Sequence, residues 1–302
     1  MSKSIKPSLG LYEKAISSTL NWEEKLCLAW QSGFDFLEMN IDPTEPRLNR
    51  LYDSAFAPML RTAMDKTGFR VQTLALTANR GFPLGSEEAL VRSKGIELVR
   101  RAVELAGETG IRVIHLAAYD EMGEKRNERT MELFQEAVFA CAKEGEAAGV
   151  MLALETMDVG GFCGMDDMLS LLKEIDSPYL KCYADIGNLA ATGHDAAREL
   201  RKGKGYIVGV HLKDTLPGIC RDVPFGQGAV NFEEGLRALF ETGYRGFFVA
   251  EMWGYDDVAF HDYLKYTNQF LRERLDAAFA NDGHSSSKRA ASSKEFAGEC
   301  LS

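Results

Sequence analysis

Short apolar runs alternate with longer amphipathic stretches from one end of the chain to the other. The runs are of strand length, and the stretches between them repeat apolar residues at helical spacing. The eight predicted strands cover residues 9–12, 34–39, 71–76, 113–117, 150–154, 180–184, 207–212 and 247–250. The clearest predicted helices cover residues 51–67, 87–109, 128–148, 165–175, 232–242 and 257–280.

Residues at the predicted helix ends support these boundaries. Gly110 and Gly149 directly follow two of the helices, where a left-handed C-terminal cap is common. Asn231 precedes another helix, and Glu234 follows it by three residues, as in a capping box.

Eight strand–helix units with nearly continuous apolar strands indicate a parallel sheet that is buried on both faces. A doubly wound sheet would normally carry a Gly-rich turn after its first strand, and residues 9–16 contain none. We therefore predict an α/β fold consisting of a single (β/α)₈ TIM barrel over residues 1–282. Residues 283–302 are rich in Ser, Lys and Gly without periodicity, and we expect a disordered tail there.

Composition narrows the possible partners. The formal net charge of −10 argues against a protein that coats nucleic acid or an anionic membrane. The sequence has no long apolar run and its first residues lack the apolar core of a signal peptide, so we expect a cytoplasmic protein.

The last four predicted strands each end in a possible metal ligand. Glu155, Asp185, His211 and Glu251 close or follow apolar runs and are 30, 26 and 40 residues apart. Each gap is about one strand–helix–strand repeat, so the four side chains should meet at the carboxyl ends of the barrel strands.

Three carboxylates in a buried barrel mouth would repel one another, and at least one pKa would rise without a counter-charge. A divalent cation relieves this repulsion, and three oxygens with one imidazole suit Zn²⁺, Mn²⁺, Co²⁺ or Mg²⁺. Any one of these residues alone could equally be a capping or salt-bridged group. Glu38 and His115 also end predicted strands, and either contact with substrate or a structural role fits them.

Several motifs resemble those of one enzyme family. The segments YADIGNL at 183–189, HLKDTLPG at 211–218, VPFGQG at 223–228 and AEMW at 250–253 closely resemble L-ribulose-5-phosphate and L-xylulose-5-phosphate 3-epimerases. Residues 9–15, 34–39 and 82–88 support the resemblance, which covers the chain to about residue 280. That family belongs to the xylose-isomerase-like barrels and acts in bacterial pentose and L-ascorbate catabolism.

The resemblance implies that Glu155, Asp185, His211 and Glu251 bind one divalent metal. It also implies that Glu155 and Glu251 form the acid–base pair of a 3-epimerase. Such an enzyme removes and returns the C3 proton of a ketopentose phosphate through an enediolate that the metal stabilises. Asn188 stands where the epimerases of free ketoses have His, and either contact with substrate hydroxyls or a helix N-cap fits it.

A phosphorylated substrate needs local cations or backbone N–H groups, because the overall charge repels it. The candidate cations are Lys14, Arg80, Lys213 and Arg221, and the loop 226–228 offers close backbone approach. Lys213 is favoured because it lies two residues beyond His211 on the strand-seven loop. A surface salt bridge is the alternative role for each cation.

Three other functions remain open. An aldose–ketose isomerase or a dehydratase would use the same metal site on a different carbon. An endonuclease of the same superfamily would need more histidine than the five in this chain. A barrel that binds a sugar phosphate without catalysis is the third. Barrels of this family often pair, so a homodimer is expected, although no stretch of sequence establishes an interface.

Overall fold

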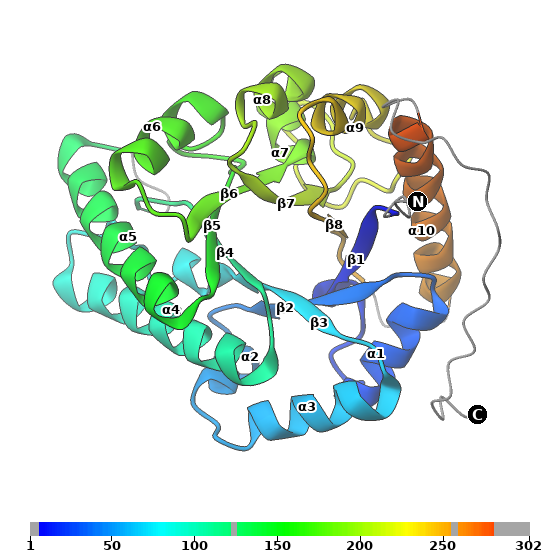
Figure 1. The fold of residues 1–302 in the computed structure, drawn as a ribbon, viewed down its shortest axis with the longest axis horizontal. Coiled ribbons are helices and arrows are strands. Elements are labelled where there is room, and N and C mark those ends of the chain that lie inside the picture. Colours follow the sequence, from blue (N-terminus) through cyan, green and yellow to red (C-terminus); the bar gives the residue numbers. More distant parts are fainter. Residues whose placement is uncertain (1–5, 122–125, 255–258, 281–302) are drawn as a thin grey trace, which may run out of the picture.

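The computed structural model describes residues 6–121, 126–254 and 259–280. Within these ranges eight parallel strands close into a barrel, and each strand pairs with its neighbours in chain order, with β8 returning to β1. Helices surround the ring of strands (Figure 1). The strands are β1 Ser8–Tyr12, β2 Phe36–Ile41, β3 Val71–Leu76, β4 Val113–Ala117, β5 Met151–Glu155, β6 Leu180–Asp185, β7 Ile207–Leu212 and β8 Phe247–Ala250.

The helices follow the strands along the chain and form the outer layer of the barrel. The α-helices are α1 Trp22–Gln31, α2 Glu45–Leu48, α3 Phe56–Thr67, α4 Ala89–Thr109, α5 Glu128–Ala148, α6 Met165–Ile175, α7 Ile186–Ala191, α8 Ala196–Lys202, α9 Phe232–Glu241 and α10 Ala259–Ala280. Three short 3₁₀ turns are η1 Glu13–Ala15, η2 Asn49–Leu51 and η3 Thr77–Arg80.

The predicted barrel is confirmed, and most strand boundaries agree within one residue. Helix α4 begins at Ala89, two residues later than predicted, and two further elements differ. The second strand begins at Phe36 and runs to Ile41, two residues later at each end than predicted. Helix α3 begins at Phe56 rather than at residue 51. The 3₁₀ turn η2 ends at Leu51, and in the segment that follows it the Asp53 side chain accepts a hydrogen bond from the Ala55 N–H at 2.9 Å.

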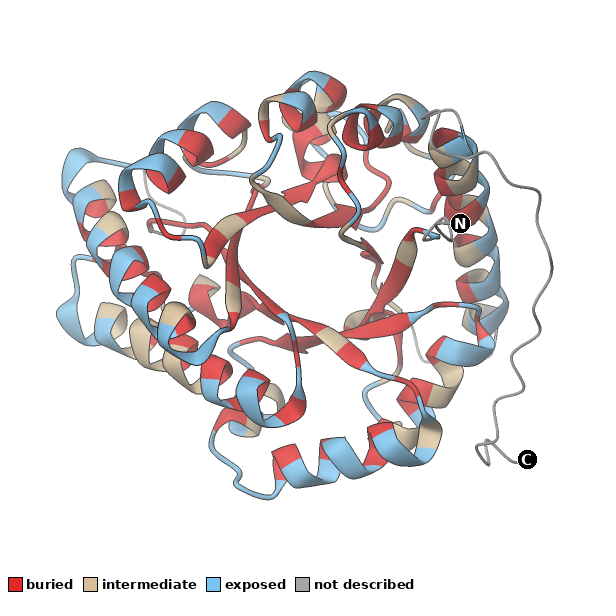
Figure 2. Cartoon of the chain, viewed as in Figure 1, coloured by how far each residue is buried: buried red, intermediate tan, exposed pale blue. Residues whose placement is uncertain are grey.

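The core lies between the strands and the helices. In Figure 2 the strands and the inward faces of the helices are buried, whereas the outward faces of the helices are exposed. Gly110 and Gly149 adopt left-handed φ values of 78° and 69°, as predicted. The Asn231 side chain caps α9 by accepting from the Glu234 N–H, but the Glu234 side chain accepts from the Asn231 side-chain amide, so the capping box is only half formed.

Among the described residues, no helix is both long enough and apolar enough to cross a bilayer. The predicted tail at 283–302 lies outside the described residues.

Candidate functional site

Four consecutive strands bring the predicted ligands together at one mouth of the barrel. Glu155 and Asp185 are the last residues of β5 and β6, His211 lies near the end of β7, and Glu251 directly follows β8. All four are buried, and one ligand atom from each lies within 4.8 Å of the others. Asp185 and His211 are direct neighbours in the β6–β7 register, so the backbone itself sets their spacing.

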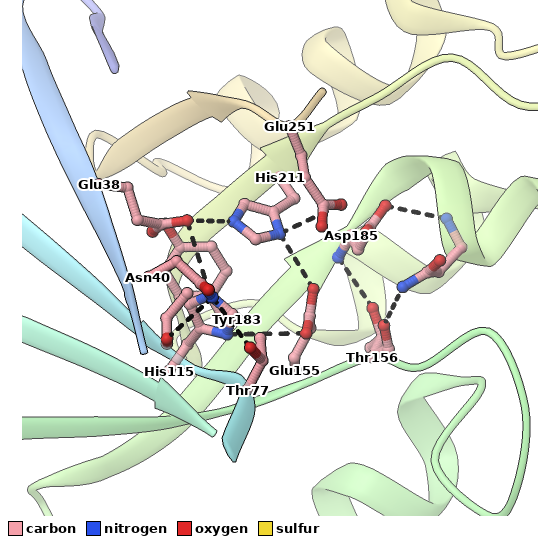
Figure 3. Close-up of polar contacts among 12 residues, drawn as sticks. Glu38, Asn40, Thr77, His115, Glu155, Thr156, Tyr183, Asp185, His211 and Glu251 are labelled. Atoms are coloured by element: carbon pink, nitrogen blue, oxygen red, sulfur yellow. Dashed lines mark hydrogen bonds and ion pairs between the residues drawn. The ribbon is translucent and has the colours of Figure 1, made fainter. Parts of the chain in front are cut away.

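His211 lies at the centre of this cluster. Its Nδ1 is 3.0 Å from Glu155 Oε1 and 3.6 Å from Glu251 Oε2. Figure 3 shows Glu155 and Glu251 reaching the space between His211 and Asp185 from opposite sides. Two carboxylates that face each other across a common space can exchange protons with both faces of a small molecule bound there.

Lys213 brings a positive charge into the same cluster. Its Nζ is 2.8 Å from Asp185 Oδ2 and 2.8 Å from Glu251 Oε2, and only 5% of the residue is exposed. Burial opposes the ammonium form, but the two carboxylates raise the pKa of Lys213 well above its ordinary value. The lysine therefore stays charged.

The ligand carboxylates respond differently to this environment. Burial raises the pKa of Asp185 to about 7, although the Lys213 ammonium opposes the shift. Burial also acts to raise the pKa of Glu251, but Lys213 and His211 hold it well below its usual range. Burial disfavours the charged imidazole of His211, yet Glu38 and Glu251 raise its pKa well above the ordinary value. The carboxylates of the cluster thus differ in acidity, and the ionised forms depend on the nearby cations.

The chemistry of the donors fits a divalent cation. Asp185 uses Oδ1 to accept the Asn188 N–H at 2.9 Å and so caps α7. Its Oδ2 is buried and lies 2.8 Å from Lys213 Nζ. Three buried carboxylates together with an imidazole match the ligand preferences of transition-metal and magnesium ions. The cluster could therefore bind a metal ion.

A second polar layer lies deeper in the barrel. Glu38 is fully buried in the middle of β2, and its Oε1 is 2.6 Å from His211 Nε2. Its Oε2 accepts hydrogen bonds from Thr73 Oγ1 and from the Tyr183 hydroxyl, both at 2.8 Å. His115 lies in the middle of β4, with its two ring nitrogens 3.6 Å from Glu38 Oε1 and 3.6 Å from Glu155 Oε2.

The prediction that Glu38 and His115 end their strands is therefore wrong. The later end of β2 and the continuation of β4 to Ala117 place both residues inside strands, below the mouth. Both nitrogens of His115 are buried without a hydrogen-bond partner.

Asn188 lies inside α7 and is not its N-cap, which is Asp185. The Asn188 side chain donates to the Thr156 carbonyl at 2.9 Å, and its Oδ1 is buried without a hydrogen bond. The N-cap interpretation is wrong because Asp185 ends β6 and begins α7 at once, so one residue serves both elements.

The four candidate cations occupy different positions. Lys14 pairs with Asp42 at 2.7 Å, and Lys213 lies within the ligand cluster. Among the described residues neither Arg80 nor Arg221 pairs with a carboxylate. The Arg80 guanidinium is 5.6 Å from the Tyr119 ring, and the exposed Arg221 is 5.2 Å from the Trp253 ring, two residues beyond Glu251.

Sequence reasoning missed the residues that support the ligands from below. Tyr183 precedes Asp185 by two residues, so both side chains point to the same face of β6. Thr73 pairs with Glu38 in the β2–β3 register. The alternation of inward-facing residues along each strand could have pointed to these side chains. Which of them contact each other across the barrel is seen only in the structure.

Comparisons with known proteins agree with this architecture. The family described as xylose isomerase-like TIM barrel matches residues 27–274. L-ribulose-5-phosphate 3-epimerase UlaE of Escherichia coli K12 is 42% identical over 246 residues, which cover 81% of this chain and 87% of that protein.

Solved structures share the fold at low sequence identity. A D-tagatose 3-epimerase-like protein has a TM-score of 0.76 at 21% identity, covering 91% of this chain and 99% of that one. An L-ribulose 3-epimerase has a TM-score of 0.75 at 18% identity, covering 95% and 100%.

Proposed function

This chain belongs to the xylose isomerase-like TIM-barrel family, and on that premise we propose that it is an isomerase that interconverts L-ribulose 5-phosphate and L-xylulose 5-phosphate. The observation that carries this proposal is the pair of buried carboxylates, Glu155 and Glu251, that face one space from opposite sides. Inversion at C3 of a 2-ketose needs two such groups, one for each face of a planar intermediate.

We propose that Glu155, Asp185, His211 and Glu251 hold one divalent ion, for which Zn²⁺, Mn²⁺, Co²⁺ and Mg²⁺ are all suitable. When bound, such an ion supplies Lewis-acid stabilisation of the negative charge that develops on the sugar oxygens. Asp185 and His211 have ligation as their only role in this scheme.

The proton transfers belong to the two glutamates. One carboxylate takes the C3 proton, and the electron pair of the broken C–H bond forms the C2=C3 bond of an enediolate. The other, entering the cycle as a carboxylic acid, returns a proton to the opposite face and restores the carbonyl.

Substrate contacts fall to residues with unused polar groups at the mouth and directly below it. Asn188 Oδ1 and the His115 nitrogens have no hydrogen-bond partner, and we assign them to the sugar hydroxyls. Arg80 and Arg221 are the better candidates for the phosphate, because a role for Lys213 there would require its ammonium to leave two carboxylates.

The proposal is tested by proton exchange followed by NMR in D₂O with L-xylulose 5-phosphate and the metal-loaded protein. We expect deuterium at C3, formation of L-ribulose 5-phosphate and no aldose. Exchange at C1 with aldose formation would replace the proposal by an aldose–ketose isomerase. Absence of exchange with every divalent metal would reject it.

Variants then assign the roles. Glu155→Gln and Glu251→Gln should each lower the rate of C3 exchange by about 10²–10⁴-fold, while Glu23→Gln on the surface should leave it unchanged. Arg221→Met should raise KM for the phosphorylated sugar and leave the rate of C3 exchange measured with free L-xylulose unchanged. Unchanged exchange in both glutamine variants would favour a barrel that binds without catalysis.

Assembly, pathway and compartment are further expectations of the same proposal. A homodimer, a place in L-ascorbate catabolism and a cytoplasmic location accord with the family resemblance.

A further inference from the structure

Glu38 is a carboxylate without access to solvent, and its described hydrogen-bond partners are all side chains. Thr73 Oγ1 and the Tyr183 hydroxyl each donate to Oε2 at 2.8 Å, and His211 Nε2 lies 2.6 Å from Oε1. Because both hydroxyls donate to Oε2, the other oxygen, Oε1, is left to accept from His211.

The two hydroxyls fix the direction of the Glu38 carboxylate. Thr73 and Tyr183 both bind Oε2 and come from β3 and β6, on different sides of the barrel. The Tyr183 ring is held against Gly209 of β7, where an added Cβ would lie 2.1 Å from Tyr183 Cε2. With Oε2 held by two strands, Oε1 lies 2.6 Å from His211 Nε2, and His115 Nε2 is farther away at 3.6 Å (Figure 3).

Neutral imidazole carries one N–H and one lone pair, and the partner of one nitrogen decides the state of the other. An N–H at Nε2 leaves the lone pair on Nδ1, which faces Glu155 at 3.0 Å and Glu251 at 3.6 Å. We infer that Glu38 is a positioning residue that accepts the Nε2–H of His211 and thereby presents Nδ1 as the metal ligand. The inference rests on the metal site of the proposed function.

A competing arrangement uses Glu38 itself as a ligand. One ligand atom each of Glu38, His115 and His211 also lies within 4.8 Å of the others. An ion there would have to displace the Nε2–H bond and share a carboxylate that already accepts two hydroxyls. We therefore favour one ion at the mouth and a hydrogen-bonded Glu38 below it.

The test measures metal binding by the full chain in the absence of sugar. Apo protein is titrated with Mn²⁺ by calorimetry for the parent, Glu38→Leu and Glu38→Gln. We expect one ion per chain, an affinity about 10–100-fold lower in Glu38→Leu, and a smaller loss in Glu38→Gln, whose amide oxygen still accepts from Nε2. Glu199→Gln, which alters a buried carboxylate on α8 outside the cluster, should bind as the parent does.

A second readout reports the tautomer directly and needs no variant. ¹⁵N NMR of the Zn²⁺-loaded parent should show a proton on His211 Nε2 and none on Nδ1. A proton on Nδ1 instead, two ions per chain, or parent-like affinity in both folded Glu38 variants would each overturn the inference. If Glu38→Leu does not fold, the tautomer and Glu38→Gln decide the question.

Failure of the proposed function would look different. A parent protein that binds one ion with Nε2 protonated, yet exchanges no C3 proton, would reject the epimerase and leave the role of Glu38 intact. A protein that exchanges the C3 proton but carries the imidazole proton on Nδ1 would reject the role of Glu38 and leave the proposed epimerase intact.

Discussion

At the scale of single residues, Lys213 is the group whose charge most affects the candidate site. Replacement by Met would leave Asp185 and Glu251 facing each other without the ammonium that contacts both. We expect metal-free protein to lose about 3–5 kcal/mol of unfolding free energy, because a buried charge pair loses one partner. Urea unfolding of the parent and Lys213→Met, each in EDTA and in excess Mn²⁺, measures the effect.

The loss of unfolding free energy should differ between EDTA and excess Mn²⁺. A dication supplies the positive charge that Lys213 otherwise gives, so excess Mn²⁺ should reduce the loss. Lys143→Met, which removes an exposed ion pair with Glu146, should unfold as the parent does in both conditions. Equal losses with and without metal would show that Lys213 does not act as a counter-charge for the ligands.

At the scale of elements, the loop between β7 and α9 depends on one side chain. Asp214 is buried, and its Oδ2 accepts the N–H groups of Gly226 and Gly228 at 2.8 and 2.9 Å. Its Oδ1 accepts the N–H groups of Thr215 and Val230, so Asp214→Asn would turn an NH₂ group toward one of the two pairs of donors. We expect a loss of about 1–3 kcal/mol and faster hydrogen exchange at the amides of that pair.

Asp195→Asn is the matched control for this substitution. Asp195 also accepts a backbone N–H, from Arg198 at 3.0 Å, as the N-cap of α8. Asn is an equally good N-cap, so this variant should keep its stability and its exchange pattern. Unchanged protection of all four backbone amides that donate to Asp214 (Thr215, Gly226, Gly228 and Val230) in Asp214→Asn would contradict the role of Asp214 as the anchor of the loop.

The strands also show which features of the site could be predicted from the sequence. Strand ends could be located because buried parallel strands are continuous apolar runs, and Glu155 and Asp185 close such runs. Glu38 interrupts its run and was assigned to the strand end, although β2 continues to Ile41. A buried charge inside a strand is tolerated only with partners, and its partners Thr73 and Tyr183 come from other strands.

At the scale of the whole molecule, the eight strand–helix units in the sequence predicted a closed barrel. The barrel in turn predicted that the residues at the carboxyl ends of its strands meet at one mouth. The position of Lys213 was beyond this reasoning, because a residue two places after His211 can point to the open rim or into the cluster. The structure has it in the cluster, paired with the carboxylates of β6 and β8. Sequence spacing fixes which strand a residue occupies, whereas side-chain direction depends on the charges across the barrel.

The first quarter of the barrel is tied together by a buried charge network far from the ligand cluster in sequence. Glu13 is fully buried after β1 and binds Lys25 of α1 at 2.9 Å and Arg50 of η2 at 2.6 Å. It also accepts the Asn40 N–H of β2 at 2.9 Å. Glu13→Gln should cost about 3–5 kcal/mol at neutral pH, because two cations lose their shared partner.

This cost should depend on pH with a defined sign. Burial acts to raise the pKa of Glu13, but Arg50 and Lys25 lower it from 4.5 to about 2. Because the pKa is lower in the folded state than in the unfolded state, ionised Glu13 contributes about 3 kcal/mol to the free energy of unfolding. This contribution is fully present above about pH 5 and is lost as the pH falls toward 2. Urea unfolding of the parent and Glu13→Gln between pH 7 and pH 3 should therefore show a gap that narrows on acidification. Glu23→Gln, with an exposed ion pair, should show no such trend, and a gap independent of pH would contradict an ionised Glu13.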